Sequence, residues 1–189
     1  MANRPSAATT PTRPGAVPSP LVVGVVVWLT SEVLFFGALF GAWFSLRSAN
    51  AGVWPPEGAE VERLLPTIGT VLLLSSSATV QLAARAARPD PDLARRWLMA
   101  TVALGTVFLG LQAREWATLP FSVDDHAYGT AFFALTGFHG LHVLGGLAAM
   151  SVLARHRPAH HDAVEVVSLY WHFVDGVWLV LFASVYLAG

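Results

Sequence analysis

The chain has 189 residues, of which 54% are hydrophobic and only 12% are charged. In soluble domains roughly a quarter of the residues are charged, so this composition indicates a protein whose solvent is lipid. The net charge of −1 gives no reason to expect nucleic acid as a partner, and the absence of cysteine excludes disulfides, thiolate nucleophiles, zinc–thiolate sites and iron–sulfur clusters.

A polar arm precedes five apolar segments. Residues 1–19 are rich in Pro, Ser and Thr and lack the apolar stretch of a signal peptide, so we expect a disordered cytoplasmic tail. Each apolar segment is long enough, at about 1.5 Å per residue, to cross a hydrocarbon layer about 30 Å thick. The predicted fold is therefore all-α, a polytopic membrane helix bundle within residues 20–189. Its transmembrane helices are predicted over residues 20–46, 64–84, 93–117, 127–154 and 163–187.

Arginine is distributed unevenly over the connections between these segments. Eight of the eleven arginines lie in the N-terminal arm, in residues 85–96 or in residues 155–162, and only three flank the opposite connections. Positive residues are enriched on the cytoplasmic side of a membrane. The sequence therefore predicts a cytoplasmic N-terminus and a C-terminus outside.

A carboxylate interrupts the first apolar segment. Glu32 lies eleven residues beyond Leu21, which corresponds to about 16 Å along a helix. An ionisable side chain at that depth is costly in hydrocarbon, so Glu32 is a candidate functional residue. The alternative is a neutral Glu that only forms a hydrogen bond to a neighbouring helix.

Four further ionisable side chains are predicted at a similar depth. His139 and His142 share one helix face, as do His172 and Asp175, because the members of each pair are three residues apart. Buried ionisable groups in lipid need partners, so these faces and Glu32 are predicted to meet as a midplane polar network. Such groups relay protons, bind metals or lock helices together. The Glu-x-x-His pattern of di-iron bundles is missing, and we interpret the network as structural, with no metal and no catalytic residue.

Three motifs follow one another along the chain. Residues 28–36 (WLTSEVLFF) contain Glu32, residues 136–142 (TGFHGLH) contain two of the midplane histidines, and residues 170–178 (YWHFVDGVW) close the series. In this order they resemble subunit III of the haem–copper cytochrome c oxidases. The resemblance extends over about residues 22–187, and Glu32 falls on the intramembrane carboxylate of that family.

The resemblance implies a supporting subunit of an aa3-type oxidase, which transfers electrons from cytochrome c to oxygen and pumps protons. In this family haem and copper belong to subunits I and II. Subunit III has no redox centre; it packs against subunit I, in a complex with subunit II and small subunits, and holds structural phospholipid. Glu32 would support proton uptake, and the location would be a bacterial plasma membrane. Membership in a supercomplex with a cytochrome bc complex is left open.

Two departures from the family pattern bear on this interpretation. The mitochondrial type has seven spans, whereas this chain resembles five-span bacterial forms, including actinobacterial ones, so lipid ligands of the first two spans are not carried over. Quinol-oxidase relatives tend to have Asp at the position of Glu32. The alternatives are subunit III of a quinol oxidase, an accessory subunit of nitric oxide reductase, a proton-coupled transporter and a haem-binding membrane anchor. No internal repeat supports the transporter.

Basic residues gather between the fourth and fifth segments. Arg155 and Arg157 precede His160 and His161, and Glu165 follows. Such clusters attract anionic lipid at the headgroup level, although they also fix topology. Because the matching segment of the oxidase family contacts phospholipid, these five residues are predicted to bind a phospholipid headgroup.

Overall fold

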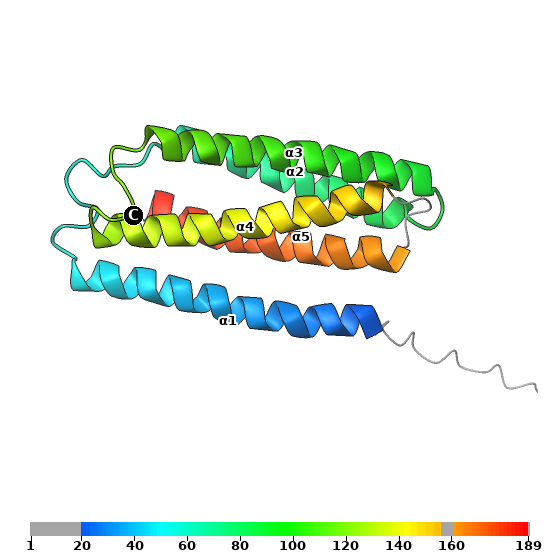
Figure 1. Ribbon diagram of the computed structural model, residues 1–189, viewed down its shortest axis with the longest axis horizontal. Helices are drawn as coiled ribbons and strands as arrows, with labels where there is room; N and C mark the ends of the chain where they lie inside the picture. Colours follow the sequence, from blue (N-terminus) through cyan, green and yellow to red (C-terminus); the bar gives the residue numbers. More distant parts are fainter. Residues whose placement is uncertain (1–19, 156–160, 189) are drawn as a thin grey trace, which may run out of the picture.

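The computed structural model describes residues 20–155 and 161–188, and the predicted disordered tail lies outside this part of the chain. All regular secondary structure in the described residues is helical, as predicted, and the bounds agree with the prediction to within a few residues (Figure 1). The helices are α1 (Pro20–Ala49), α2 (Leu64–Ala86), α3 (Pro91–Thr118), α4 (Ala127–Arg155) and α5 (His161–Phe182), which continues as a π-helical turn, η1 (Ala183–Leu187). We call the end of the bundle at which α1 begins the N-end, and the opposite end the C-end.

Local sequence sets where the helices begin and end. The side chain of Asp90 accepts a hydrogen bond from the backbone N–H of Leu93 at 2.9 Å, and Pro91 occupies the first turn of α3. Both are favoured at helix N-termini, where backbone N–H groups have no partner within the helix. At the same end of the bundle, Nε of Arg95 donates to the carbonyl oxygen of Ala154 at 2.7 Å. This bond satisfies a carbonyl in the last turn of α4.

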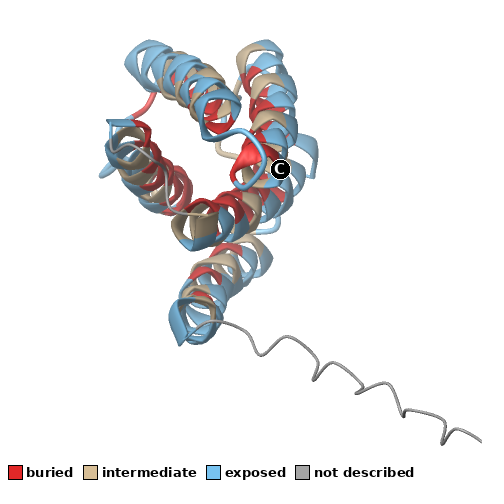
Figure 2. Ribbon diagram, turned by 90° about the vertical axis from the view of Figure 1, so that its right-hand side faces the viewer, coloured by how far each residue is buried: buried red, intermediate tan, exposed pale blue. Residues whose placement is uncertain are grey.

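Helices α2 to α5 form a closed ring, in which α2 packs on α3, α3 on α4, α4 on α5 and α5 on α2. Helix α1 stands outside this ring and packs against α4 and α5 (Figure 2). Its buried residues, Leu29, Phe36 and Trp43, are seven apart and form one narrow stripe. All five helices are long and apolar enough to cross a bilayer. The chain is a multi-pass membrane protein whose many exposed apolar side chains suit a lipid solvent.

The indole of Trp171 occupies the centre of the ring. It comes from α5, is fully buried, and donates from Nε1 to Oγ of Ser76 on α2 at 2.9 Å. A Cβ atom at Gly105 of α3 or at Gly146 of α4 would lie only 2.9 Å or 2.7 Å from the indole ring. The indole therefore fits because these two positions have no side chain. It contacts α2, α3 and α4 and so joins them to α5.

Trp178 repeats this arrangement seven residues further along α5. Its Nε1 donates to Oγ1 of Thr70 on α2 at 2.9 Å, and its ring centroid lies 4.8 Å from that of Phe108 on α3. Buried tryptophans contribute a large apolar surface but need an acceptor for the indole N–H. Both needs are met at both positions, so α5 is the element on which the other three helices of the ring converge.

Gly146→Ala is predicted to lower the thermal stability of the detergent-solubilised protein, because the new methyl group would press on Trp171. Overpacking a well-packed core costs about 1–3 kcal/mol. Gly145→Ala is the matched control: its Cβ would make an ordinary contact, 3.6 Å from the Tyr170 hydroxyl, and Ala favours a helix over Gly by about 1 kcal/mol. Equal shifts in melting temperature for the two variants would contradict the position of Trp171.

Candidate functional site

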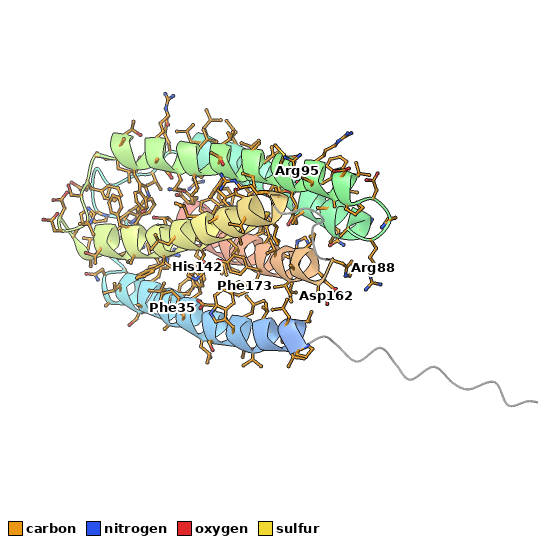
Figure 3. All side chains as sticks on the ribbon, turned by 45° about the vertical axis from the view of Figure 1, so that its right-hand side comes forward. Phe35, Arg88, Arg95, His142, Asp162 and Phe173 are labelled. Carbon is orange, nitrogen blue, oxygen red and sulfur yellow. The ribbon has the colours of Figure 1, made fainter. Side chains whose placement is uncertain are left out.

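Glu32 and His142 form the polar contact between α1 and the ring. Oε2 of Glu32 lies 3.0 Å from Nε2 of His142, and the two side chains are only 18% and 17% exposed. The rings of Phe35 and Phe36 lie 6.2 Å and 4.9 Å from the His142 ring, measured between centroids. Figure 3 shows Phe35, His142 and Phe173 where α1 meets α4 and α5. The pair is therefore enclosed largely by aromatic side chains.

Hydrogen-bond geometry determines how many protons this pair holds. Nδ1 of His142 lies 2.7 Å from the carbonyl oxygen of Phe138. A carbonyl only accepts, so we assign the proton of this bond to Nδ1. Nε2 then either accepts from a protonated Glu32 or donates, as part of an imidazolium, to the carboxylate. In both states the pair shares one proton and has no net charge, which lowers the cost of burying it.

Tyr170 of α5 connects the same region to the ring. Its hydroxyl donates to the backbone carbonyl of His142 at 2.8 Å, and its ring stacks on Trp28 of α1 with centroids 5.3 Å apart. The three motifs of the sequence therefore meet here: Trp28 and Glu32 from the first, His142 from the second and Tyr170 from the third.

A second polar cluster joins α2 and α5, and we call it the α2–α5 seam; it comprises Ser77, Gln81, Ser168, His172 and Asp175. Ser77 donates to Oδ2 of Asp175 and lies 3.0 Å from Nδ1 of His172. Nε2 of His172 lies 3.1 Å from Oε1 of Gln81 and 3.4 Å from Oγ of Ser168. Asp175 is 3% exposed, and its Oδ1 has no hydrogen-bond partner among the described residues.

The single midplane network predicted from the sequence is corrected by these positions. His142 bonds Glu32 between α4 and α1, whereas His172 and Asp175 bond residues of α2. His139 belongs to neither cluster. Two side chains three residues apart on a helix point in directions that differ by about 60°. This difference is enough for His139 to face the interior of the ring while His142 faces α1.

His139 lies among apolar rings. It is 1% exposed, and its ring centroid lies 5.9 Å from that of Phe108 and 5.0 Å from that of Trp178. Neither of its ring nitrogens has a hydrogen-bond partner in the part of the chain that the structure describes. Helices α4 and α5 are joined instead by the bond from the Tyr170 hydroxyl to the backbone carbonyl of His142 and by the apolar core.

A buried carboxyl near the C-end was missed by the sequence analysis. Glu115 is 4% exposed, and its Oε2 accepts from Nε2 of Gln112 at 2.7 Å and from the hydroxyl of Tyr186 at 2.9 Å. Gln112 and Glu115 are three apart on α3 and so share a face. This spacing was the available signal, since two polar residues on one face of a transmembrane helix indicate a buried contact.

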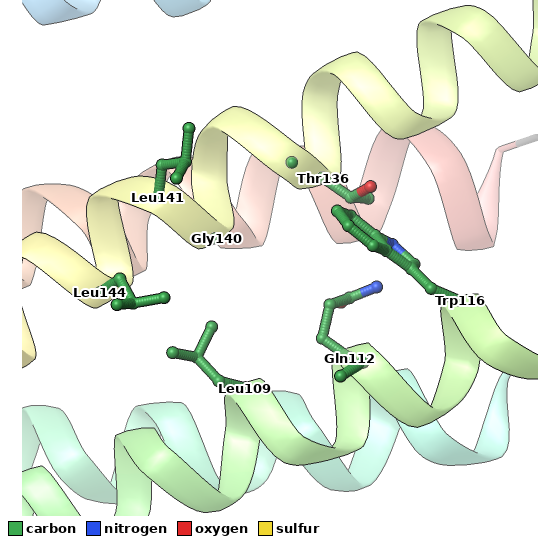
Figure 4. A pocket seen from close by; sticks show the side chains of 9 residues that line it. Leu109, Gln112, Trp116, Thr136, Gly140, Leu141 and Leu144 are labelled. Atoms are coloured by element: carbon green, nitrogen blue, oxygen red, sulfur yellow. The ribbon is translucent and has the colours of Figure 1, made fainter. Parts of the chain in front are cut away.

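The outer surface between α3 and α4 is hollowed by a groove of about 500 Å³ (Figure 4). It lies beside Gln112 and Trp116 on α3 and beside Thr136 and Gly140 on α4. The lining surface is apolar and contains no ionisable side chain among the described residues. The groove is therefore unsuited to acid–base or nucleophilic chemistry.

Three of the five predicted lipid-binding residues, Arg155, His161 and Glu165, lie at the N-end, whereas Arg157 and His160 are outside the described residues. Arg155 is exposed at the end of α4. Nδ1 of His161 lies 3.2 Å from Oδ1 of Asp162 and 3.8 Å from Oε2 of Glu165.

These three residues, His161, Asp162 and Glu165, are the one cluster of at least three metal-ligating side chains that the described segments contain. Figure 3 places Arg88, Arg95 and Asp162 at this same end of the bundle. Exposed acidic groups of this kind are common without a metal, so the cluster does not by itself indicate a metal centre.

Comparisons with known proteins agree with the resemblance carried by the three motifs. A family model described as cytochrome c oxidase subunit III matches residues 7–189. Cytochrome c oxidase subunit 3 of Thermostichus vulcanus is 42% identical over 174 residues, which cover 88% of this chain and 86% of that protein. A probable cytochrome c oxidase subunit 3 of Nocardia farcinica is 41% identical over 179 residues, covering 89% and 88%. The Arabidopsis thaliana subunit 3 is 40% identical, covering 88% of this chain and 68% of that protein.

Glu32→Leu is predicted to destabilise the packing of α1, because it leaves Nε2 of His142 without a partner; such a loss costs about 1–3 kcal/mol. Glu32→Gln is the matched control, since an amide N–H donates to Nε2 of a neutral imidazole. Thermal unfolding in detergent should therefore rank Gln close to the native protein and Leu clearly below it. Equal stability of the two variants would contradict a bonded Glu32–His142 pair.

Proposed function

The chain belongs to the cytochrome c oxidase subunit III family, and on that premise we propose that it is a supporting subunit of a proton-pumping, aa3-type oxidase in a bacterial plasma membrane. It would pack directly against subunit I, in a complex that also contains subunit II and small subunits. Haem and copper would be bound by subunits I and II, and electron transfer from cytochrome c to oxygen would take place there.

One observation carries this proposal: two of the three family motifs contain a carboxyl side chain, and each of these carboxyls is bonded to a neighbouring helix. Glu32 bonds His142 across the contact between α1 and α4, and Asp175 accepts from Ser77 across the contact between α5 and α2. Groups used in this way hold helices together. They do not converge on a shared space in which a substrate would meet several of them.

Glu32 is proposed to have a further role in supporting proton uptake. The Glu32–His142 pair holds one shared proton and remains neutral overall, so the proton can move between the two side chains without creating net charge in the membrane. Glu32→Gln keeps the hydrogen bond but removes this exchange, which separates the proposed role from packing.

Structural phospholipid is proposed to bind at the N-end. Arg155 is exposed there, and each basic residue near an anionic surface contributes about 1 kcal/mol of attraction. Arg157 and His160 are proposed to add to this site. Nδ1 of His161 lies 3.8 Å from Oε2 of Glu165, and a ring N–H of His161 is proposed to donate to the lipid phosphate.

The oxidase without this chain is predicted to start at a similar rate per haem but to lose activity sooner during turnover. The physical reason is that the chain carries packing, lipid and proton-uptake support, whereas the bonds that break and form lie in other subunits. Oxygen consumption followed to inactivation measures both quantities in one trace. An initial rate that collapses although haem is retained, or an unchanged lifetime, would contradict the proposal.

The double variant Arg155→Gln, Arg157→Gln tests the lipid part within the same assay. The oxidase that contains this variant should retain less anionic lipid. Its working lifetime should be shorter than that of the native oxidase and closer to that of the complex that lacks the chain. Arg96→Gln is the matched control, because Arg96 is exposed at the same end of the bundle. Equal lipid loss in both variants would leave general surface charge as the explanation.

A further inference from the structure

The α2–α5 seam is open on one side. Ser77, Gln81 and His172 are each only partly buried. His172 is eleven residues from His161, where α5 begins, and this corresponds to about 16 Å along the helix. The open side therefore lies at a depth at which lipid hydrocarbon surrounds the protein, and lipid headgroups stay nearer the surface.

The seam also has unused hydrogen-bonding capacity. Oε1 of Gln81 is bonded to His172, whereas the two amide N–H donors of Gln81 have no partner in the described segments of the chain. Polar groups that face hydrocarbon without a partner are costly. An acyl chain cannot supply the missing acceptor, so lipid tails alone are a poor cover for this surface.

Two small residues flank the seam and leave room beside it. Ala78 of α2 and Gly176 of α5 are both exposed, and a Cβ atom built at Gly176 meets no atom within 4 Å. Small residues at such positions let a second helix approach closely in a membrane. Within this chain the remaining helix, α1, packs against α4 and α5.

We propose that the α2–α5 seam is the docking surface for a transmembrane helix of another subunit, which presents a hydrogen-bond acceptor to the Gln81 amide and passes over Gly176. The acceptor is a hydroxyl, amide or carboxyl oxygen at the depth of Gln81. This inference rests on the proposed function, because it takes the partner helix from the same oxidase. It adds to the proposed function the face of this chain that makes the contact and the chemical groups that form it.

The open face around Gly110 on α3 provides an internal control. Gly110 is exposed, and a Cβ atom there also meets nothing within 4 Å. Its neighbours three residues away, Val107 and Ala113, are apolar and exposed. Of those four residues away, Thr106 donates to the carbonyl oxygen of Val102 on its own helix and Arg114 is exposed. The surface next to Gly110 therefore suits lipid tails. A bulky residue at position 110 therefore tests the effect of size alone.

The test uses the complex purified through a tag on this chain in mild detergent. Gly176→Phe should lower the haem retained per tagged chain by about tenfold, which corresponds to about 1.4 kcal/mol, whereas Gly110→Phe should retain as much as the native chain. Native-like retention by Gly176→Phe, or equal losses in both variants, would overturn the proposal. A native chain that retains no haem-bearing subunit would instead contradict the proposed function itself.

A second measurement applies even if the bulky variant folds poorly. The chain has no cysteine, so Gly176→Cys and Gly110→Cys each give this subunit a single reactive site. In the intact complex, a lipid-soluble maleimide should label position 110 readily and position 176 slowly. Equal labelling rates at the two positions would show that lipid covers the seam and would overturn the docking surface.

Discussion

The packing of one indole side chain fixes how helices α2 to α5 are rotated about their axes. Trp171 fills a space that exists because Gly105 and Gly146 have no side chains, and its N–H is bonded to Ser76. Rotating α5 by one residue position would turn the indole away by about 100°. The space would then be unfilled and the Ser76 hydroxyl would lose its donor. The neighbours of Trp171 in the sequence are therefore directed in fixed ways: Tyr170 toward α1 and α4, and His172 toward α2.

The polar contacts follow from this rotation and from the lipid solvent. A charged or polar side chain in hydrocarbon needs a partner, and Glu32, Asp175 and Glu115 each find one on another helix. The Glu32–His142 pair meets this requirement with one shared proton, and Glu115 meets it with Gln112 and Tyr186. The same requirement is unmet at Gln81, on the open side of the seam.

The sequence predicts the five helices well because membrane thickness and apolar length determine them almost alone. It also identifies Glu32, His142, His172 and Asp175 as side chains that need partners, but it wrongly includes His139, whose ring nitrogens have no partner among the described residues. It does not identify which partners, because that depends on helix rotation, and the rotation is set by contacts such as Trp171 with Gly146, whose members are far apart in the chain. Glu115 was missed for a related reason, because a carboxyl near a helix end does not stand out until the neighbouring helix is known.

The tryptophans of α5 hold the four-helix ring together, and hydrogen exchange of the indole N–H groups tests this most directly. The indoles of Trp171 and Trp178 are buried and bonded to α2, whereas Trp116 is 36% exposed near the C-end. Followed by NMR in detergent micelles, Trp171 and Trp178 should exchange only when the bundle opens globally, far more slowly than Trp116. Exchange of all three indoles at similar rates would contradict this account.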